Sequence, residues 1–503
     1  MSDFVSIKFL RRILIAGAAT AALCVGFAAA PALEWRGASA QEITPRAIAP
    51  PSGAPTSFAD LIERVRPAVV SISVRQRPDA AAGPVVEGLP PGFEEFFRGR
   101  PGRPGPAPTA LGSGFFIDQS GVVVTNHHVI EGAEEITIRT SDGRDLPADI
   151  VGSDQPTDLA VLRVRGGGRF PFVNFDDASH VRVGDWVVAV GNPFGLDGTA
   201  TAGIVSAIGR RDAGSSAYVD YMQIDAPINR GNSGGPTFDL SGRVIGVNSA
   251  IFSPTGGSVG IGFAIPSGTA NTIVHQLLDA GRVTRGWIGV SIQGIDQDMA
   301  ASLGLDEPRG ALVGSVVPDG PAARAGIQQG DVIVTYDGQR IEDNRDLTQR
   351  VGATRVGQTT RVEVLRGGAR RTLNLRLAER PSEQTLASAT PTPNATPQEE
   401  QGGTAQSSLG LSARPMTPED RTRYELAANE AGLVVTVVDP ASDVAQKGVR
   451  AGDIILQAGG RSVRTLQELN TAVDAAQRAN RPLLLQVDGR AGRRFVAANL
   501  GER

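Results

Sequence analysis

The stretch QIDAPINRGNSGGP, Gln223 to Pro236, places one serine among three glycines and an asparagine, directly before a proline. Gly, Asn, Ser and Pro are the usual turn residues, so the stretch could be only a tight loop between two strands. The same small residues would let a substrate approach the backbone beside a nucleophilic Ser233. The choice depends on whether a base and an acid for Ser233 occur elsewhere in the chain.

Length and composition limit the class of protein. The 503 residues are enough for about three domains. A content of 41% hydrophobic residues suffices for globular folding, and 62 glycines with 33 prolines indicate many turns, as in a mainly β protein. The net charge of -4 is small, with both signs interspersed, so we expect no nucleic-acid partner.

Residues 1–40 have the pattern of a secretory signal peptide. Lys8 and the pair Arg11-Arg12 precede an apolar run from Ile13 to Ala30, and Ala38-Ser39-Ala40 supplies a small-residue cleavage site. We expect export to the periplasm with cleavage near Ala40. The alternative is an uncleaved membrane anchor, because the run is about long enough to cross a bilayer.

The only cysteine, Cys24, lies inside this signal segment. A chain cleaved near Ala40 would therefore have no disulfide, no Cys-ligated metal and no cysteine nucleophile. We expect no metal and no cofactor, and any nucleophile would be Ser, Thr, Lys or a carboxylate.

The region after the signal reads as a β-rich domain. Residues 41–56 form a Pro/Ala-rich lead before a domain expected at 57–281. From Leu111 to Pro266 short apolar runs alternate with turn signals, as in a closed or packed all-β architecture. Helical periodicity follows from Ser267, with Gly281 as the expected helix end. A Gly/Pro-rich insertion occupies 75–108, and we expect its Phe96 and Phe97 to dock on a partner surface.

The C-terminal half contains an internal repeat. AGIQQGDVIVTYDGQRIEDNRDL, Ala325 to Leu347, is echoed by KGVRAGDIILQAGGRSVRTLQEL, Lys447 to Leu469. We therefore expect two similar modules, at 282–378 and 408–503. The segment 379–407 is rich in Pro, Thr, Ser, Ala and Gln, which predicts a flexible linker.

The four histidines make the search for a base short. His275 falls within a helical pattern and His180 on a turn, so for both we expect a surface or structural role. His127 and His128, in VVVTNHHVI, close an apolar β-run, where a side chain can reach a cleft. A buried structural pair or a metal-binding pair is the alternative, but adjacent residues on extended backbone point apart, which disfavours shared chelation.

A third group is needed to orient the base. In PTDLAVLRV, Asp158 enters a run of Leu, Ala and Val, where a partly buried carboxylate would need a partner such as an imidazole. Asp154 has the simpler pattern of a turn residue. Peptide N–H groups near Gly231 and Ser233 can then form an oxyanion hole, because small residues leave that backbone accessible.

Taken together, the motifs TNHHV, TDLAVL and GNSGGP, in the order His, Asp, Ser, resemble the trypsin-like proteases of the HtrA family, also called Do-like or DegP/DegQ-like. GNPFG, INRGNSGGP and GIGFAIP extend the resemblance, which runs from about Ser57 to the C-terminus. The two repeats resemble PDZ domains. The resemblance implies a mainly β chain, with a chymotrypsin-like double β-barrel followed by two PDZ domains.

The resemblance also assigns a catalytic triad. Ser233 is the expected nucleophile, His128 the general base and then acid, and Asp158 the group that orients the imidazole. His127 fills a position that is not usually histidine in the family, and the register of the motif selects His128. The expected oxyanion hole comprises Gly231, Asn232 and Ser233.

Further site residues follow from the resemblance. Arg210 matches a regulatory sensor-loop arginine, with a solvated surface arginine as the alternative. The expected substrate pocket, suited to small or medium aliphatic residues, is lined by Ile261, Gly262, Phe263 and Ala264. The loop expected to bind peptide C-termini is Arg285, Gly286, Trp287, Ile288, Gly289 and Val290. In the second module SSLGLS, Ser407 to Ser412, takes the matching place.

The function that the resemblance implies is an ATP-independent serine endopeptidase of the cell envelope that degrades unfolded or damaged proteins. Its expected partners are such substrates and peptide C-termini, and its basic unit is a homotrimer that can form larger cages. The second hypothesis is a chaperone or PDZ scaffold in which proteolysis is minor.

Overall fold

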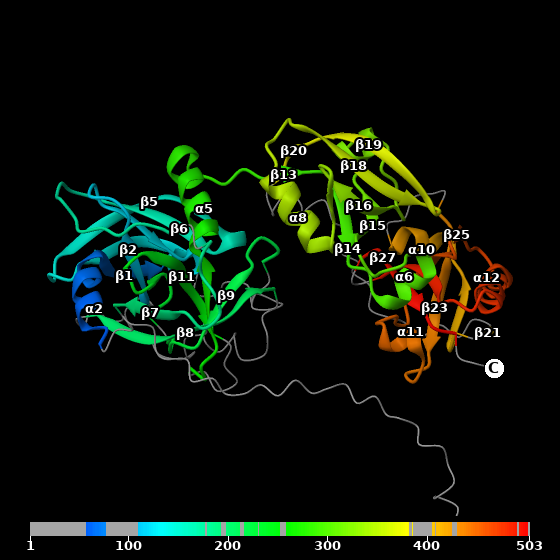
Figure 1. The fold of residues 1–503 in the computed structure, drawn as a ribbon. Coiled ribbons are helices and arrows are strands. Elements are labelled where there is room, and N and C mark those ends of the chain that lie inside the picture. The colour runs from blue at the N-terminus through cyan, green and yellow to red at the C-terminus, as the bar shows by residue number, and fades with distance from the viewer. Residues whose placement is uncertain are drawn as a thin grey trace, which may run out of the picture. The chain divides into compact units, whose positions relative to one another are not determined.

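The computed structural model describes most of the chain from residue 57 onward (Figure 1). Residues 1–40, predicted to be a signal segment, residues 41–56 and the pair Phe96-Phe97 lie outside the described residues. The helices and strands of the described residues belong to the unit Phe58–Arg503. The described ranges are 57–76, 109–176, 179–192, 198–211, 216–229, 231–251, 258–381, 385, 405–407, 409–424, 430–489 and 492–500.

The first six strands close into an antiparallel barrel in the order β1-β2-β3-β6-β5-β4. Apolar side chains at alternate positions fill its interior, as the pleat of a strand requires. The strands are β1 (Val69–Gln76), β2 (Thr109–Phe116), β3 (Val122–Thr125), β4 (Ala133–Arg139), β5 (Asp145–Asp154) and β6 (Leu159–Val164).

The next six strands close a second barrel in the order β7-β8-β9-β12-β11-β10, which repeats the strand order of the first barrel. Closure removes the free sheet edges that would otherwise remain open to pairing. The strands are β7 (Trp186–Gly191), β8 (Thr199–Arg210), β9 (Tyr221–Ile224), β10 (Pro236–Phe238), β11 (Val244–Ile251) and β12 (Gly262–Pro266).

A third apolar cluster lies outside the two barrel interiors and combines residues of both barrels. Phe115 and Val124 of the first barrel pack there with Phe238 and Ile265 of the second. The helix α5 (Ser267–Ala280) contributes its apolar face to the same cluster and contacts β5, β6, β11 and β12. This shared core fixes one barrel against the other and so determines which barrel loops meet.

Short helices complete this region. The helix α5 ends at Gly281, whose φ of 68° is the left-handed conformation that favours glycine at a helix C-terminus. The others are α2 (Ala59–Val65), the 3-10 turn η2 (Arg66–Ala68), α4 (His127–Ile130) and the 3-10 turn η4 (Gln155–Thr157).

The first repeat forms a module built on an antiparallel sheet of order β14-β15-β16-β18-β19, with β13 paired to β20. Its elements are β13 (Gly286–Trp287), β14 (Val290–Gln293), α6 (Gln297–Leu303), β15 (Ala311–Val316), α7 (Pro321–Ala325), β16 (Val332–Tyr336), β17 (Gln339–Arg340), α8 (Asn344–Ala353), β18 (Thr359–Arg366), β19 (Ala369–Arg376) and β20 (Ala378–Glu379).

The second repeat forms a module with the sheet order β21-β22-β23-β24-β26-β27. Its elements are β21 (Ala405–Ser407), β22 (Leu411–Pro415), α10 (Pro418–Arg423), β23 (Leu433–Val438), α11 (Asp443–Gln446), β24 (Ile454–Ala458), β25 (Arg461–Ser462), α12 (Leu466–Arg478), β26 (Leu483–Asp488) and β27 (Arg494–Ala498). The range 379–407, expected as a linker, therefore contributes Glu379 to β20 of the first module and the whole of β21 to the second.

The repeated Gly-Asp pair has the same structural role in both modules. Asp331 accepts the N–H of Gln328 at 2.8 Å, and Asp453 accepts the N–H of Arg450 at 3.1 Å. Each carboxylate thus closes the turn before the strand that follows it, as Asx residues commonly do. The two modules therefore share the Gly-Asp pair because both need the same turn.

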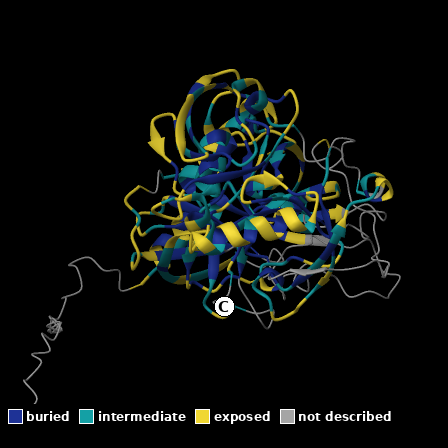
Figure 2. Cartoon of the chain, turned by 90° about the vertical axis from the view of Figure 1, so that its right-hand side faces the viewer, coloured by how far each residue is buried: buried dark blue, intermediate teal, exposed yellow. Residues whose placement is uncertain are grey.

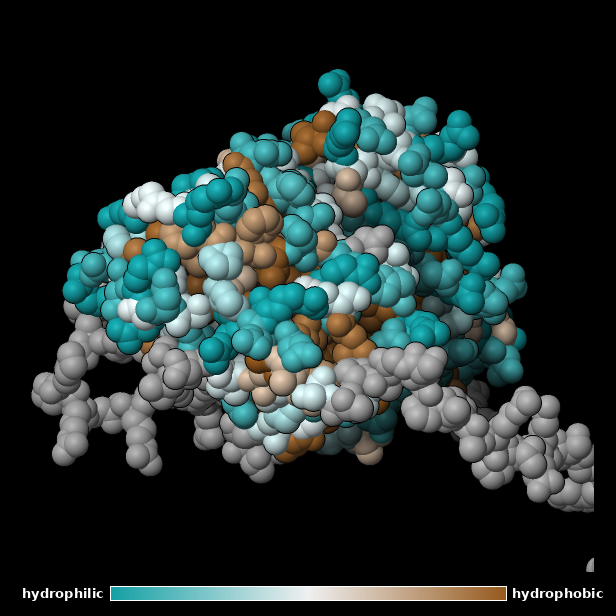
Figure 3. Space-filling view, turned by 60° about the vertical axis from the view of Figure 1, so that its left-hand side comes forward, coloured by the Kyte–Doolittle hydropathy of each residue, from teal (hydrophilic) through white to brown (hydrophobic). Residues whose placement is uncertain are grey.

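Burial follows the expected pattern. Dark blue buried segments run through the sheets, and yellow exposed residues follow one side of the surface helices (Figure 2). In the space-filling view, hydrophobic residues form separate patches within a largely hydrophilic face (Figure 3). No helix among the described residues is long and apolar enough to cross a membrane. The prediction of a mainly β chain with a double-barrel domain is confirmed.

Candidate active site

His128 and Asp158 lie at adjacent turns of the first barrel. The strand β3 ends at Thr125, and the single-turn helix α4 that follows carries His128. Asp158 stands between η4 and β6 in the left-handed conformation, with φ 56° and ψ 38°. Aspartate tolerates this conformation better than most residues. Asp154 stabilises the turn because its carboxylate accepts the N–H of Thr157 at 3.2 Å.

The imidazole of His128 is bound by the carboxylate of Asp158. Nδ1 of His128 lies 2.9 Å from both Oδ1 and Oδ2, so Nδ1–H donates to the carboxylate and Nε2 is the nitrogen on the opposite side of the ring. The backbone N–H of His128 donates to Oδ1 at 3.0 Å. The carbonyl of Asp158 accepts from Asn126 Nδ2 at 2.9 Å and from the N–H of His127 at 3.1 Å.

A residue of the second barrel completes the environment of Asp158. The hydroxyl of Ser249, on β11, donates to Oδ2 of Asp158 at 2.8 Å. Ser249 lies within the apolar strand GRVIGVNSAI without a motif of its own, so the sequence does not single it out. Only the packing of β11 against the first barrel brings this hydroxyl to the carboxylate.

This pairing shifts both pKa values. Burial lowers the pKa of His128, but the charge of Asp158 and its hydrogen bond outweigh burial and raise the pKa above its ordinary value of about 6.5. Burial raises the pKa of Asp158, but the charge of His128 and the hydrogen bonds from His128 and Ser249 hold it below its ordinary range. Asp158 therefore stays ionised near neutral pH, and His128 titrates above its usual pH.

The loop that carries Ser233 lies against these residues. Ser233 is 6% exposed, and its carbonyl accepts the N–H of Ser113 at 2.9 Å. A Cβ added to Gly234 would lie 2.2 Å from the carbonyl oxygen of Ser113 and 3.1 Å from the backbone N of Asn126. The N–H of Gly234 donates to the carbonyl of Asn248 at 2.8 Å. Ser233 is therefore held between the segment of His128 and the segment of Ser249.

The predicted oxyanion residues differ in what their N–H groups do. Gly231 has φ 99°, and in the part of the chain that the structure describes, neither its N–H nor that of Ser233 has an acceptor. The N–H of Asn232, in contrast, donates to the carbonyl of Asn229 at 3.0 Å. Two of the three predicted residues thus present a donor, while Asn232 closes the turn.

Of the predicted pocket residues, Gly262, Phe263 and Ala264 lie on β12 and Ile261 directly precedes it. Phe263 belongs to the core between the barrels and contacts the ring of Tyr221, while Ala264 belongs to the interior of the second barrel. Successive residues of a strand point to opposite faces, so these two cannot line one pocket. Gly262 packs closely, because an added Cβ would lie 2.9 Å from Ile228. Ile261 packs partly buried on the core of Phe263.

The two predicted arginines are both engaged. Nε of Arg210 donates to Oε1 of Gln223 at 2.9 Å. Arg285 is 8% exposed, and its guanidinium binds Asp154 through two bonds of 2.7 and 2.6 Å and lies over the ring of Tyr218. The structure therefore places Arg285 on the turn before Asp158 and not in the peptide loop expected for it.

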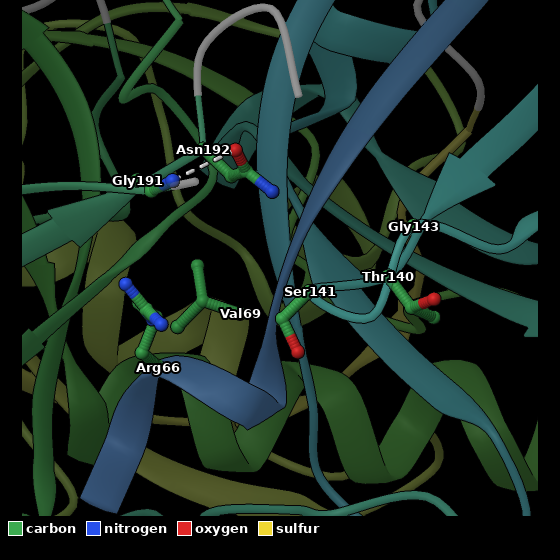
Figure 4. Close-up of a pocket in the computed structure, with 8 residues that line it drawn as sticks. Arg66, Val69, Thr140, Ser141, Gly143, Gly191 and Asn192 are labelled. Atoms are coloured by element: carbon green, nitrogen blue, oxygen red, sulfur yellow. Dashed lines mark hydrogen bonds between the residues drawn. The ribbon is translucent and has the colours of Figure 1, made fainter. Parts of the chain in front are cut away.

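Two other places in the described residues have features of a site. Asp176, His180 and Asp239 could hold a metal ion by their geometry, but Arg243 binds both carboxylates, at 2.7 and 2.8 Å. A small pocket beside Asn192 is lined by residues of both barrels, and none of the predicted triad residues lines it (Figure 4). Its lining residues are Arg66, Val69, Thr140, Ser141, Gly143, Gly191, Asn192 and Gly198.

Protein-family models match the barrel region and both repeat modules. Residues 112–247 match the family model described as a trypsin-like peptidase domain. Residues 286–377 and 407–492 each match the PDZ domain model, which confirms that the two repeat modules are PDZ domains.

Curated relatives match nearly the full length. A probable periplasmic serine endoprotease, DegP-like, from Brucella suis biovar 1 is 43% identical, over 94% of this chain and 93% of the relative. The chain belongs to the HtrA family of serine proteases. A DegP-like relative from Rhizobium meliloti is 41% identical, over 97% of this HtrA chain and 99% of its own.

Among solved structures, the HtrA-type protease AlgW with a tripeptide is 38% identical, with a TM-score of 0.56. It matches 65% of this chain and 99% of its own. The predicted family, the predicted fold class and the prediction of a serine endopeptidase are thus confirmed for this HtrA protein.

Gly234→Ala tests the close packing of the Ser233 loop, with Gly143→Ala as the matched control. Both glycines have positive φ, 83° and 85°, so both variants bear the left-handed strain of about 1–2 kcal/mol. Only at Gly234 does a Cβ meet backbone, since nothing lies within 4 Å at Gly143. Gly234→Ala should lower the Tm more than Gly143→Ala does, and it should abolish cleavage of unfolded casein. Equal Tm values in the two variants would contradict the packing argument.

Proposed function

We propose that this HtrA protease is an ATP-independent endopeptidase of the cell envelope that degrades unfolded or damaged proteins through an acyl-enzyme. The observation that carries the proposal is the pair of 2.9 Å contacts between Nδ1 of His128 and the carboxylate of Asp158, beside the loop of Ser233. This arrangement leaves Nε2 of His128 as the base for a serine hydroxyl.

In the first step, His128 accepts the proton of Ser233 as Oγ attacks the scissile carbonyl. Asp158 holds the imidazole in one tautomer and stabilises the imidazolium that forms. Its own three donors, from His128 N–H, His128 Nδ1–H and Ser249, keep the carboxylate charged throughout. The imidazolium then gives the proton to the leaving amine.

The tetrahedral oxyanion is bound by the N–H groups of Gly231 and Ser233 in this proposal. Their lack of acceptors within the described residues supports that role. Removing one such donor from a protease typically costs about 3–4 kcal/mol of transition-state stabilisation. Water, activated by neutral His128, then hydrolyses the ester on Ser233.

For substrate selection, we propose that the wall near Ile261 to Phe263 receives a small or medium aliphatic side chain. Gly262 lies between them in the chain and faces Ile228 in the interior of the second barrel, so it does not line this wall. The side chains of Ile261 and Phe263 are apolar and pack on the same core. An apolar wall accepts aliphatic groups and disfavours charged ones, because a charge buried there would have no partner.

The first PDZ domain is the proposed site for peptide C-termini. Its strand β14 stands at the end of the sheet order and pairs only with β15 among the described strands, so a peptide can add to its other edge. The loop before β14 turns at Gly289, with φ 76°. In the second PDZ domain that edge of β22 is already paired with β21, so we propose no peptide there.

Regulation is proposed to pass through contacts between the first PDZ domain and the protease domain. Arg285 immediately precedes β13, and its partner Asp154 caps the turn that carries Asp158. A peptide that shifts this region of the PDZ domain would thereby act on the turn. Arg210 is the proposed sensor, because its partner Gln223 lies on β9, the strand before the Ser233 loop.

The location and assembly are proposals as well. The relatives' names describe periplasmic proteins, which supports export of this chain to the periplasm. We propose a homotrimer as the basic unit, with larger cages built from trimers, and a chaperone activity beside proteolysis.

Ser233→Ala tests the proteolytic function. Removal of the nucleophile should reduce cleavage of unfolded casein by about 10⁴-fold or more, because the other groups act as a unit with it. Ser241→Ala, at an exposed turn serine, is the control and should cleave normally. If Ser233→Ala cleaved casein as the wild type does, the proposal would be wrong. Suppression of casein aggregation by Ser233→Ala would support the chaperone hypothesis.

Replacing each histidine by alanine tests the assignment of the base. His128→Ala should abolish casein cleavage, since the imidazole bound to Asp158 is lost. His127→Ala should keep most of it, because the ring of His127 has no hydrogen bond to Asp158 and its buried Nδ1 lacks a partner within the described residues. The reverse result would show that His127 is the base.

The pH dependence of kcat/KM reports the titration of His128. Only neutral His128 can accept a proton, and its raised pKa keeps it protonated above pH 6.5, so activity should rise with pH through a midpoint above that value. Ser249→Ala removes a hydrogen bond that partly neutralises the carboxylate of Asp158. The carboxylate then stabilises the imidazolium of His128 more strongly, so the midpoint of activity should move to higher pH. An unchanged or lower midpoint, relative to Ser241→Ala, would refute this link.

A further inference from the structure

Ser113 is a buried residue of β2 that lies against the loop carrying Ser233. Its side chain has 0% exposure. Its backbone N–H donates to the carbonyl of Ser233 at 2.9 Å, and its hydroxyl donates to the carbonyl of Gly231. A single residue thus holds the carbonyls of both residues whose N–H groups form the proposed oxyanion hole.

The hydroxyl of Ser113 has a second partner in the same barrel as that loop. The N–H of Asn192, which follows β7, donates to Oγ of Ser113 at 2.8 Å. The side chain of Asn192 in turn accepts the N–H of Gly198 at 3.2 Å. Ser113 therefore joins the first barrel to two separate segments of the second.

The two bonds of the hydroxyl determine each other's direction. A serine hydroxyl has one hydrogen and two lone pairs. Because the N–H of Asn192 can only donate, it occupies a lone pair, and the single hydrogen of Ser113 is directed to the carbonyl of Gly231. The hydrogen bond from the N–H of Asn192 to Oγ of Ser113 thus orients the hydrogen bond from Ser113 to the carbonyl of Gly231.

Gly231 needs such a restraint. Without a side chain, its backbone can change between conformations at little steric cost, and its observed φ is 99°. If the Ser113 hydroxyl were absent, the buried carbonyl of Gly231 and the N–H of Asn192 would both lose a partner. Unpaired buried polar groups are unfavourable, so the loop would rearrange to satisfy them.

We propose that Ser113 is a positioning residue that holds the Gly231–Gly235 loop in the shape that presents both oxyanion donors. The inference rests on the proposed function of Gly231 and Ser233, and it adds the residue that keeps them in place. Ser113 acts through the loop and does not touch the reacting atoms.

The test compares Ser113→Ala with the wild-type full chain in two kinds of binding. A tripeptide boronic acid ending in boroVal forms a tetrahedral adduct with the active serine, and the matching peptide carboxamide does not. Ser113→Ala should weaken inhibition by the boronic acid, and lower kcat on casein, by roughly 10- to 100-fold. The KM and the inhibition constant of the carboxamide should change by less than about threefold.

Controls separate positioning from general damage. Ser267→Ala also removes a fully buried hydroxyl, but this hydroxyl has no partner among the described residues. The variant should therefore bind the boronic acid and the carboxamide as the wild type does. Ser113→Cys keeps the size and a weak donor, and should recover part of the boronic-acid affinity. Equal losses for boronic acid and carboxamide, no loss at all, or a Cys variant no better than Ala would each overturn the proposal. Unchanged boronic-acid binding by Ser233→Ala would instead refute the proposed function.

Discussion

The carboxylate of Asp158 is a negative charge held between two β-barrels, and the active region is organised around its partners. Burying a charge is strongly unfavourable unless hydrogen bonds and an opposite charge compensate for it. The first barrel supplies the ring and the backbone N–H of His128, and the second barrel supplies Ser249. The carboxylate is therefore satisfied only when the barrels are docked, so docking and assembly of the site are one event.

Close approach of backbones is the second constraint. Gly234 lies so near the carbonyl of Ser113 that no Cβ fits between them. A Cβ added to Gly235 would likewise lie only 2.3 Å from the carbonyl oxygen of Val190. The glycines next to Ser233 serve this packing as well as substrate access. Ser113 then supplies directional bonds that a loop of small residues cannot supply for itself.

Much of this architecture follows from local signals. Alternating apolar runs predict the strands, the helical pattern predicts α5 with its terminal Gly281, and the repeated Gly-Asp segments predict two similar modules. His128, Asp158 and Ser233 were recognisable because each lies in a motif of small or polar residues beside an apolar strand. Ser249 and Ser113 were not recognisable, since each is a serine within a strand and its partners lie far along the chain.

The sequence by itself determined which residue types stand at strand ends and turns, because these depend on neighbours a few positions away. That was enough to predict the family and the fold class correctly, and to propose His128, Asp158 and Ser233 as the catalytic residues. Tertiary structure alone decided that Asn232 closes a turn, that Phe263 and Ala264 face different cores, and that Arg285 binds Asp154. Those outcomes depend on how separate sheets and loops pack, and packing distances between residues distant in the chain are not encoded in any local pattern.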